Sequence, residues 1–322
     1  MDPAAAIFVA GHRGLVGSSI LRRLEGSHYT NLLTRPRSEL DLTDAAAVFR
    51  FFDEQRPEYV FLGAAKVGGI LANATYPGDF IRENLAIQSN VIEASRRAGV
   101  RRLLFLGSSC IYPRDCPQPI KEEYLLTGPL ETTNRAYAVA KIAGIEMCRS
   151  YNQQYGTRFL SVMPTNLYGP GDNFDLATSH VLPALMRKVH EAKMEGRPSV
   201  TMWGTGKVRR EVLYSDDLAD AVVFLMTLAD GAFEECCRMD PPLLNIGCGE
   251  DQTIRELMEQ VMETVGYRGT VEHDLSKPDG TPQKLLDISR MRALGWRPKT
   301  TLRAGLAEFY RAFLKEHASA QV

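Results

Sequence analysis

The chain has 322 residues, of which 44% are hydrophobic, and can therefore bury one large core or two joined cores. Its 38 basic and 39 acidic side chains give a formal net charge of −1, which excludes bulk attraction to nucleic acid or to an anionic membrane. The six cysteines form no Cys-x-x-Cys pair and no apolar stretch approaches the ~18 residues that span a bilayer, so we expect a thiol-reduced, cytoplasmic protein without a metal site.

Short apolar runs alternate with longer amphipathic segments through the first half of the chain. Strands are predicted over residues 5–10, 31–33, 59–62, 102–106 and 159–163, and helices over residues 15–24, 43–55, 77–97 and 135–154. Strict alternation of strand and helix predicts an α/β fold with a doubly wound, Rossmann-type parallel sheet. The run GPGDNF after Tyr168 interrupts this rhythm and predicts a loop.

The chain is expected to divide between two domains. Residues 1–172 plus about 212–245 are predicted to form the Rossmann-type domain, because residues 211–227 have the pattern of a return to the first sheet. Residues about 173–211 plus 246–322 are predicted to form a smaller α/β domain that binds the substrate. The cleft between two such domains is the expected ligand site.

The sequence GHRGLVG connects the first predicted strand to the first helix. It places Gly11, Gly14 and Gly17 where a chain must turn tightly and approach a ligand closely. A helix that begins there offers free backbone N–H groups and a partial positive charge to a pyrophosphate. The segment therefore predicts a dinucleotide site.

The end of the second strand indicates which dinucleotide is bound. An acidic residue there usually accepts from the ribose hydroxyl of NAD, whereas arginine suits the 2′-phosphate of NADP. Here the strand ends in Thr34-Arg35-Pro36-Arg37, and Arg13 lies inside the glycine loop, so NADP(H) is favoured. Alternatively these arginines are only solvated and Glu39 contacts the ribose. Asp41 lies near the adenine, or simply begins the next helix with Thr43 as its cap.

Tyr137 and Lys141 have the spacing that places two side chains on one face of a helix. A nearby ammonium favours phenolate, so Lys141 is expected to lower the pKa of Tyr137 and make it a usable proton donor and acceptor. Ser108 follows the fourth strand, at the edge of the sheet where ligands bind, and can hydrogen-bond a substrate oxygen.

Taken in order, GHRGLVG, GAAKVGG, GSSCIYP, YAVAK and PTNLYGP resemble the extended short-chain dehydrogenase/reductases over nearly the whole chain. Within them, AAKVGGI, LGSSCIYP, AKIAGI, DNF, SHVLPAL and KPDGTP are most similar to the GDP-L-fucose synthase family. This resemblance implies an NADPH-dependent epimerase-reductase that converts GDP-4-keto-6-deoxy-D-mannose to GDP-L-fucose. The helices over residues 77–97 and 135–154 carry apolar side chains on more than one face, as the interface of a homodimer requires, although core burial explains part of this pattern.

The resemblance assigns roles to individual residues. It implies that Ser108, Tyr137 and Lys141 act in reduction and that Cys110 and His180 are the acid/base pair of epimerisation. The implied cofactor-binding residues are Gly11, Arg13, Gly14, Leu15, Val16, Gly17, Arg37, Asp41, Ala64, Lys141, Pro164, Asn166 and His180. The implied substrate-binding residues are Asn166, Arg187, Trp203, Arg210 and Lys284, whereas Lys188 and Arg209 are expected to be surface charges. Without the resemblance, Cys110 reads equally well as a small buried side chain, and His180 as a capping or core histidine.

The sequence also departs from the family pattern. Gly171 stands where the family often has a histidine before DNF, and Gln283 stands where it has a basic residue. Both departures fall near the expected substrate edge. They leave open a related GDP-4-keto-sugar, such as a 6-deoxyheptose, as the substrate. A non-catalytic dinucleotide sensor on the same fold is a further alternative, although such a protein is expected to lack the Ser, Tyr and Lys set.

Overall fold

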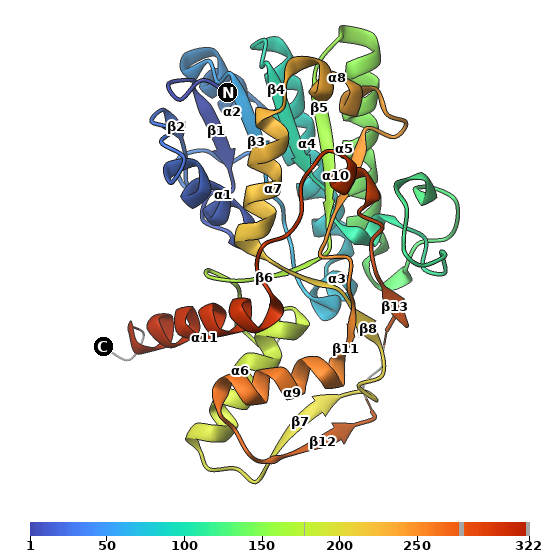
Figure 1. Cartoon of the computed structure of the whole chain (residues 1–322). Helices are drawn as coiled ribbons and strands as arrows, with labels where there is room; N and C mark the ends of the chain where they lie inside the picture. Colours follow the sequence, from blue (N-terminus) through green and yellow to red (C-terminus); the bar gives the residue numbers. More distant parts are fainter. Residues whose placement is uncertain (177, 277–279, 320–322) are drawn as a thin grey trace.

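A computed structural model describes residues 1–176, 178–276 and 280–319 (Figure 1). Within these described residues the largest feature is a six-stranded sheet in which every neighbouring pair of strands is parallel. In spatial order the strands are β2 (Leu32–Leu33), β1 (Ile7–Ala10), β3 (Tyr59–Leu62), β4 (Arg102–Leu106), β5 (Phe159–Pro164) and β10 (Leu243–Ile246). The predicted doubly wound α/β fold is confirmed.

Helices cover both faces of this sheet, because its strands alternate their side chains between two apolar cores. In β1, Ile7 and Val9 face the first core, whereas Phe8 and Ala10 face the second. The first core is completed by α1 (Leu15–Glu25), α7 (Ser215–Thr227), α8 (Asp230–Arg238) and α10 (Ser289–Ala293). The second is completed by α2 (Ala45–Gln55), α4 (Pro77–Arg97) and α5 (Arg135–Tyr155). In Figure 1, α7 crosses in front of the sheet.

A third apolar core lies beyond the carboxyl edge of the sheet, in the lower part of Figure 1. It is formed mainly by α6 (Val181–Met194), β7 (Ser199–Trp203), α9 (Ile254–Val265), β12 (Thr270–Asp274) and α11 (Leu302–Ser319). Short strand pairs connect it to the main sheet. They involve β6 (Asn166–Tyr168), β8 (Arg209–Arg210), β9 (Val212–Tyr214), β11 (Gln252–Thr253) and β13 (Gln283–Lys284).

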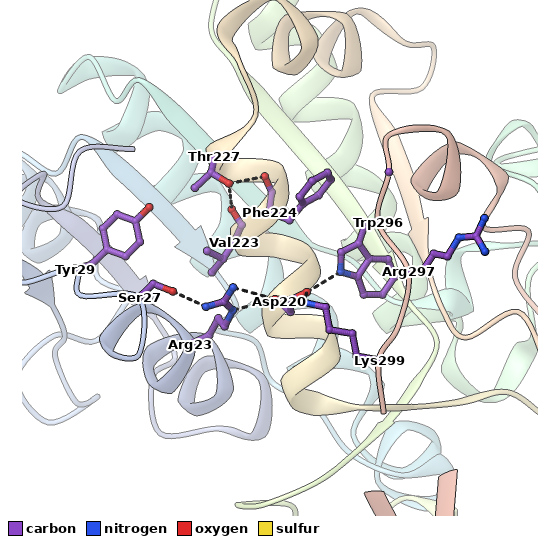
Figure 2. Close-up of a pocket in the computed structure, with 11 residues that line it drawn as sticks. Arg23, Ser27, Tyr29, Asp220, Val223, Phe224, Thr227, Trp296, Arg297 and Lys299 are labelled. Atoms are coloured by element: carbon purple, nitrogen blue, oxygen red, sulfur yellow. Dashed lines mark hydrogen bonds and ion pairs between the residues drawn. The ribbon is translucent and has the colours of Figure 1, made fainter. Parts of the chain in front are cut away.

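The segment before α11 is fastened to the helices of the first core at a hollow separate from the carboxyl edge of the sheet (Figure 2). Asp220 of α7 is the centre of this connection. Its carboxylate accepts hydrogen bonds from Arg23 Nε at 3.0 Å and from the buried indole of Trp296 at 3.1 Å, and it pairs with Lys299 Nζ at 2.9 Å. One carboxylate therefore joins α1, α7 and residues 296–299.

Two local predictions need correction. Asp44, not Thr43, caps α2: its side chain accepts from the backbone N–H of Ala47, while Thr43 bonds to Asp41 in the preceding turn. The short helix α3 (Ile70–Thr75) was not predicted from the sequence. Residues 277–279 of the KPDGTP motif lie outside the described residues.

Candidate active site

The glycine loop makes a turn that larger residues would obstruct. Gly11 has φ of +84°, and a Cβ there would lie 2.8 Å from the backbone of Ala64. A Cβ on Gly17 would lie 2.1 Å from the carbonyl oxygen of Gly11. No side chain caps the N-terminus of α1 at Gly14, so its first N–H groups are available to a ligand. The local structure thus fits the pyrophosphate of a dinucleotide.

A cavity of about 650 Å³ runs along the carboxyl edge of the sheet from this loop. It lies where β1 is flanked by β2 on one side and β3 on the other, the position at which strand order reverses and ligands bind. The sequence-predicted residues that line it are Gly11, Gly14, Leu15, Val16, Gly17, Arg37, Asp41, Ala64, Ser108, Tyr137, Lys141, Pro164, Asn166 and His180. Arg13 is exposed and lies outside this lining.

One end of the cavity is lined by cations and carboxylates. Arg35 and Arg37 both line it, and Arg37, with 71% of its side chain exposed, lies 3.4 Å from Asp41 and 3.6 Å from Glu83. Sequence reasoning assigned no role to Lys66, whose Nζ lies 2.7 Å from Glu83 in the same lining. Its position inside the motif GAAKVGG was the available signal. This end is suited to the adenosine side of a dinucleotide that carries a 2′-phosphate.

The residues predicted for reduction lie where β4 ends and α5 begins. Lys141 Nζ donates to the carbonyl oxygen of Leu106 at 2.8 Å and lies 5.8 Å from the centre of the Tyr137 ring. The Ser108 hydroxyl is within hydrogen-bonding reach of the Tyr137 phenol and of the Cys110 thiol. The three residues predicted for reduction are therefore brought together.

The predicted effect of Lys141 on Tyr137 was wrong for the protein without ligands. Burial and the neighbouring Cys110 raise the pKa of Tyr137 above its usual value, and the hydrogen bond with Ser108 opposes this only in part. Burial also lowers the pKa of Lys141 to about 8. The physical reason is desolvation, which disfavours the charged form of both groups.

The pKa values of Cys110 and His180 are also shifted from those of the free side chains, in opposite directions. Cys110 lies in the short turn Ser109–Ile111 and is only 5% exposed; burial raises the pKa of its thiol, and the nearby Lys284 ammonium partly offsets this. His180 occupies the N-cap position of α6 without a side-chain capping bond; its side chain is exposed to the cavity, but the protein around the ring desolvates it and lowers its pKa. The difference between the pKa values of Cys110 and His180 is therefore larger than the difference between the two free side chains in water.

Of the residues expected to hold the substrate, Asn166 lines the cavity, whereas the other four are not part of its lining: Arg187, Trp203, Arg210 and Lys284. Trp203 is 55% exposed at the end of β7, and Lys188 Nζ lies 4.6 Å from the centre of its ring. Arg187 instead pairs with Glu191 at 2.7 Å and donates to the carbonyl oxygen of Phe174. Sequence reasoning treated Lys188 as a surface charge, and only the fold shows that it stacks on Trp203.

Arg210 and Lys284 are register partners on β8 and β13. Arg210 Nη1 donates to the carbonyl oxygens of Arg209 and Thr281, and the Lys284 ammonium interacts with the Cys110 thiol. Asn166 Nδ2 donates to the carbonyl oxygen of Glu211 at 3.0 Å. Lys284 thus brings a positive charge from the short connecting strand β13 to the thiol.

The two departures from the family pattern have different surroundings. Gly171 lines the cavity with φ of +82°, a left-handed conformation that favours glycine. Gln283 instead donates to Asp251 at 2.6 Å, and Arg209 bonds to the same carboxylate. Only Gly171 therefore changes the shape of the cavity.

A glycine turn leading into a helix at the carboxyl edge of a parallel sheet, joined by one cavity to the Tyr137-Lys141 pair, defines a Rossmann-type, dinucleotide-dependent enzyme. Comparison with family models is more specific. The model described as "NAD dependent epimerase/dehydratase family" matches residues 7–237, and the chain belongs to that family.

Individual relatives narrow the comparison. GDP-L-fucose synthase 1 of Arabidopsis thaliana is 55% identical over 98% of this chain and 94% of its own. GDP-L-fucose synthase of Escherichia coli (strain K12) is 52% identical over 96% of both chains. Among solved structures, the GDP-mannoheptose C4 reductase of Campylobacter jejuni with NADP bound has a TM-score of 0.89 at 40% identity, covering 98% of this chain and 99% of its own. Among the described residues, no helix combines the length and hydropathy needed to cross a membrane.

Proposed function

We propose that the protein epimerises GDP-4-keto-6-deoxy-D-mannose and reduces it with NADPH to GDP-L-fucose. The observation that carries this proposal is the convergence of Ser108, Tyr137 and Lys141 with His180 on one dinucleotide-shaped cavity, with Cys110 directly beside Ser108. Relatives named GDP-L-fucose synthase, at 52–55% identity over almost the whole chain, support it.

The glycine loop and the arginines at the far end of the cavity would hold NADP(H), and the steric cradle at Gly17 supports this assignment. When bound, this cofactor supplies a hydride to the ketone carbon. The similar structure of the Campylobacter jejuni GDP-mannoheptose C4 reductase, which has NADP bound, supports NADP(H) as the cofactor. Arg37 and Arg35 offer charge-assisted hydrogen bonds to the 2′-phosphate.

Reduction of the ketone leaves negative charge on its oxygen. Tyr137 donates its phenolic proton there, and its raised pKa makes the neutral, proton-bearing form dominant near neutral pH. Ser108 hydrogen-bonds the same oxygen and holds it near the phenol. Lys141, anchored on the Leu106 carbonyl, stabilises the phenolate that remains.

Epimerisation uses the acidity of the hydrogens on the two carbons beside the ketone. The Cys110 thiolate removes one of these protons, the electron pair delocalises onto the ketone oxygen, and His180 returns a proton to the other face of the carbon. Lys284 stabilises the thiolate by its positive charge, because it is the ammonium that lowers the pKa of Cys110 most. The same exchange at the second flanking carbon gives the two inversions that GDP-L-fucose requires. After each inversion the Cys110 thiol has gained one proton and His180 has lost one, and the pair returns to its starting state by exchanging protons with solvent.

The sugar nucleotide is held by residues beside the cavity. We assign its diphosphate to the forked donors of Arg210, with Lys284 and Asn166 nearer the sugar. The base contacts Trp203, whose orientation is supported by the stacked Lys188. Arg187 was expected in this role, but its bonds to Glu191 and Phe174 make Lys188 the better candidate on this helix.

Three further proposals concern the whole molecule. The division into residues 1–172 plus about 212–245 and about 173–211 plus 246–322 is supported by the separation of the third core from the first two. A homodimer through α4 and α5 is supported by the exposed Val139 and Tyr155 on α5. A cytoplasmic location is supported by six free thiols.

The alternative substrate is a GDP-linked 4-keto heptose, which the 40% identity to the mannoheptose reductase supports less strongly. The test is to incubate the protein with GDP-4-keto-6-deoxy-D-mannose and NADPH and to identify the product by NMR. GDP-L-fucose is the expected product. Turnover of only the corresponding heptose would favour the alternative, and NADPH binding without turnover of either sugar would favour the non-catalytic sensor.

A further inference from the structure

Glu211 is a buried carboxylate that the proposed mechanism does not use. It lies between the short strands β8 and β9 and is completely buried. Both of its carboxylate oxygens accept backbone hydrogen bonds: Oε1 from Gly249 at 2.7 Å and Oε2 from Leu286 at 3.0 Å. A Cβ on Gly247 would lie 2.2 Å from Oε1, so the loop after β10 packs directly against the carboxylate. The side chain thus joins two segments that are far from it in the sequence.

The bond to Leu286 completes the pairing of the segment after β13. On one side of this segment, Ile120 donates its N–H to the carbonyl oxygen of Leu285 at 2.7 Å, and Asp287 donates to the carbonyl oxygen of Ile120 at 2.8 Å. In this parallel pattern the residue between the two bonds directs its own N–H to the opposite side. There Oε2 of Glu211 accepts it. A buried N–H without an acceptor is costly, so loss of this oxygen favours a shift of the segment.

Glu211 therefore contacts the chain on both sides of the Lys284 side chain. Its own N–H donates to the Lys284 carbonyl oxygen at 3.2 Å, and Oε2 accepts from Leu286, two residues further on. A regular parallel ladder would use the Glu211 carbonyl oxygen for the second bond. That oxygen instead accepts from the side chains of Thr165 at 3.1 Å and Asn166 at 3.0 Å. The carboxylate thus completes the ladder in place of the carbonyl oxygen.

The direction of the Lys284 side chain follows from this segment. Lys284 and Leu286 share a face, because side chains two residues apart on an extended chain point the same way. Leu286 belongs to the second core together with Ile111, the residue after Cys110. The Lys284 ammonium interacts with the Cys110 thiol. A displacement of the segment therefore changes the distance between the ammonium and the thiol.

We propose that Glu211 is a positioning residue for epimerisation: its carboxylate holds residues 284–286 in register, and this register keeps the Lys284 ammonium beside the Cys110 thiol. The inference rests on the proposed function, in which Lys284 stabilises the thiolate. Glu211 does not line the cavity, so it is placed to touch neither substrate nor cofactor. It acts on the proton transfer through Lys284.

Glu211→Gln tests this inference, because the amide keeps the size of the side chain but offers only one acceptor oxygen to the two N–H groups. With NADP⁺ in place of NADPH no reduction occurs, and NMR measures how fast deuterium from heavy water enters GDP-4-keto-6-deoxy-D-mannose. We expect the variant to lose about 10- to 100-fold in this rate, the range for a misplaced group. Its affinity for NADP⁺ should be unchanged, because the glycine loop is untouched.

Asp217→Asn is the matched control. Asp217 is also a buried carboxylate that accepts a backbone N–H, from Thr300 at 2.9 Å, and it does not line the cavity. Both variants should lose stability in denaturant titrations, but the control should keep the parent rate of deuterium entry. Glu211→Asp is a second variant in case Glu211→Gln does not fold: it keeps both acceptor oxygens on a shorter side chain and should also slow deuterium entry.

The decisive measurement repeats the substitution in a Lys284→Met protein. If Glu211 acts through Lys284, the two losses overlap, and Glu211→Gln should slow deuterium entry there by less than about threefold further. An equally large loss from Glu211→Gln in both proteins, or a parent-like rate in Glu211→Gln alone, would overturn the inference and leave the proposed function intact. A parent protein that brings no deuterium into the sugar would instead show that the proposed function has failed.

Discussion

Replacing Cys110 by serine tests the step that separates an epimerase-reductase from a simple reductase. The substitution keeps the shape of a side chain that is 5% exposed, but the hydroxyl is a far weaker acid than a thiol. The positive charge of Lys284 can stabilise a thiolate here and has no comparable anion to stabilise in the variant. We expect proton removal to slow by about 100- to 10,000-fold, the range for a lost general acid/base, which corresponds to roughly 3–5 kcal/mol in the barrier.

The assay follows deuterium entering the sugar from heavy water and identifies the product by NMR. Because Ser108, Tyr137 and Lys141 remain, the variant should still consume NADPH slowly and release a GDP-6-deoxyhexose of unchanged configuration. Cys116→Ser is the matched control, since Cys116 is a partly buried thiol outside the proposed machinery. Since burial raises the pKa of Cys110, deuterium entry into the parent's substrate should also increase with pH.

A Cys110→Ser variant that made GDP-L-fucose at the parent rate would refute this reasoning and leave the thiol as a packing group. The companion variant His180→Asn separates the two faces of the reaction. It should block complete inversion but permit exchange of a proton at unchanged configuration, because Cys110 can remove and return it on one face.

The remaining predictions concern reduction, cofactor choice and stability. Tyr137→Phe should nearly abolish NADPH oxidation while deuterium still enters the sugar; simultaneous loss of both in a folded variant would contradict the division of roles. NADPH should be preferred over NADH by at least ~10-fold, because one charge-assisted contact contributes about 1.5–3 kcal/mol. In steady-state kinetics Arg37→Met should reduce the preference for NADPH more than Arg13→Met, since only Arg37 lines the cavity. If the parent protein used NADH and NADPH equally well, the assignment of the 2′-phosphate to these arginines would be wrong. Asp220→Ala should lower the free energy of unfolding by about 2–4 kcal/mol, because it leaves the buried Trp296 N–H unpaired, and Asp220→Asn should cost less in denaturant titrations. Burial raises the pKa of the Asp220 carboxyl, but the bonds from Lys299 and Trp296 outweigh burial and lower the pKa in the folded protein. The stability that Asp220 contributes should therefore be present above pH ~4 and disappear as the pH falls below that value. Equal losses of stability for the alanine and asparagine variants would contradict this account of Trp296.

Sequence reasoning located the sheet well because its signals are local. Buried parallel strands are short, continuous apolar runs, and the predicted residues 59–62 and 102–106 match β3 and β4 exactly as they stand in the structure. The short strands β8, β11 and β13 were not separated from their surroundings, because two residues carry no periodicity. Their pairing depends on contacts between segments more than 30 residues apart, such as Arg210 with Gln252.

The sequence predicted which residues belong to the candidate site wherever a motif contains them. It predicted their pKa values and partners less well, because these depend on burial. The glycine loop and the Tyr137-Lys141 pair could be read from spacing alone. The direction of the Tyr137 pKa could not, because desolvation depends on everything packed around the phenol. For the same reason Lys188 was taken for a surface charge, since its partner Trp203 lies 15 residues away on a different element.

The position of β10 in the sheet bears on how the protein is made. β5 is buried along its whole length, and its outer neighbour β10 follows only after 78 intervening residues, 165–242. Until those residues have been synthesised, β5 presents an unpaired apolar edge, the kind of surface that pairs with other chains. At ~5–20 residues per second this exposure lasts roughly 4–16 seconds on the ribosome. A nascent chain of this enzyme therefore exposes the outer edge of β5 to other chains until β10 can pair with it.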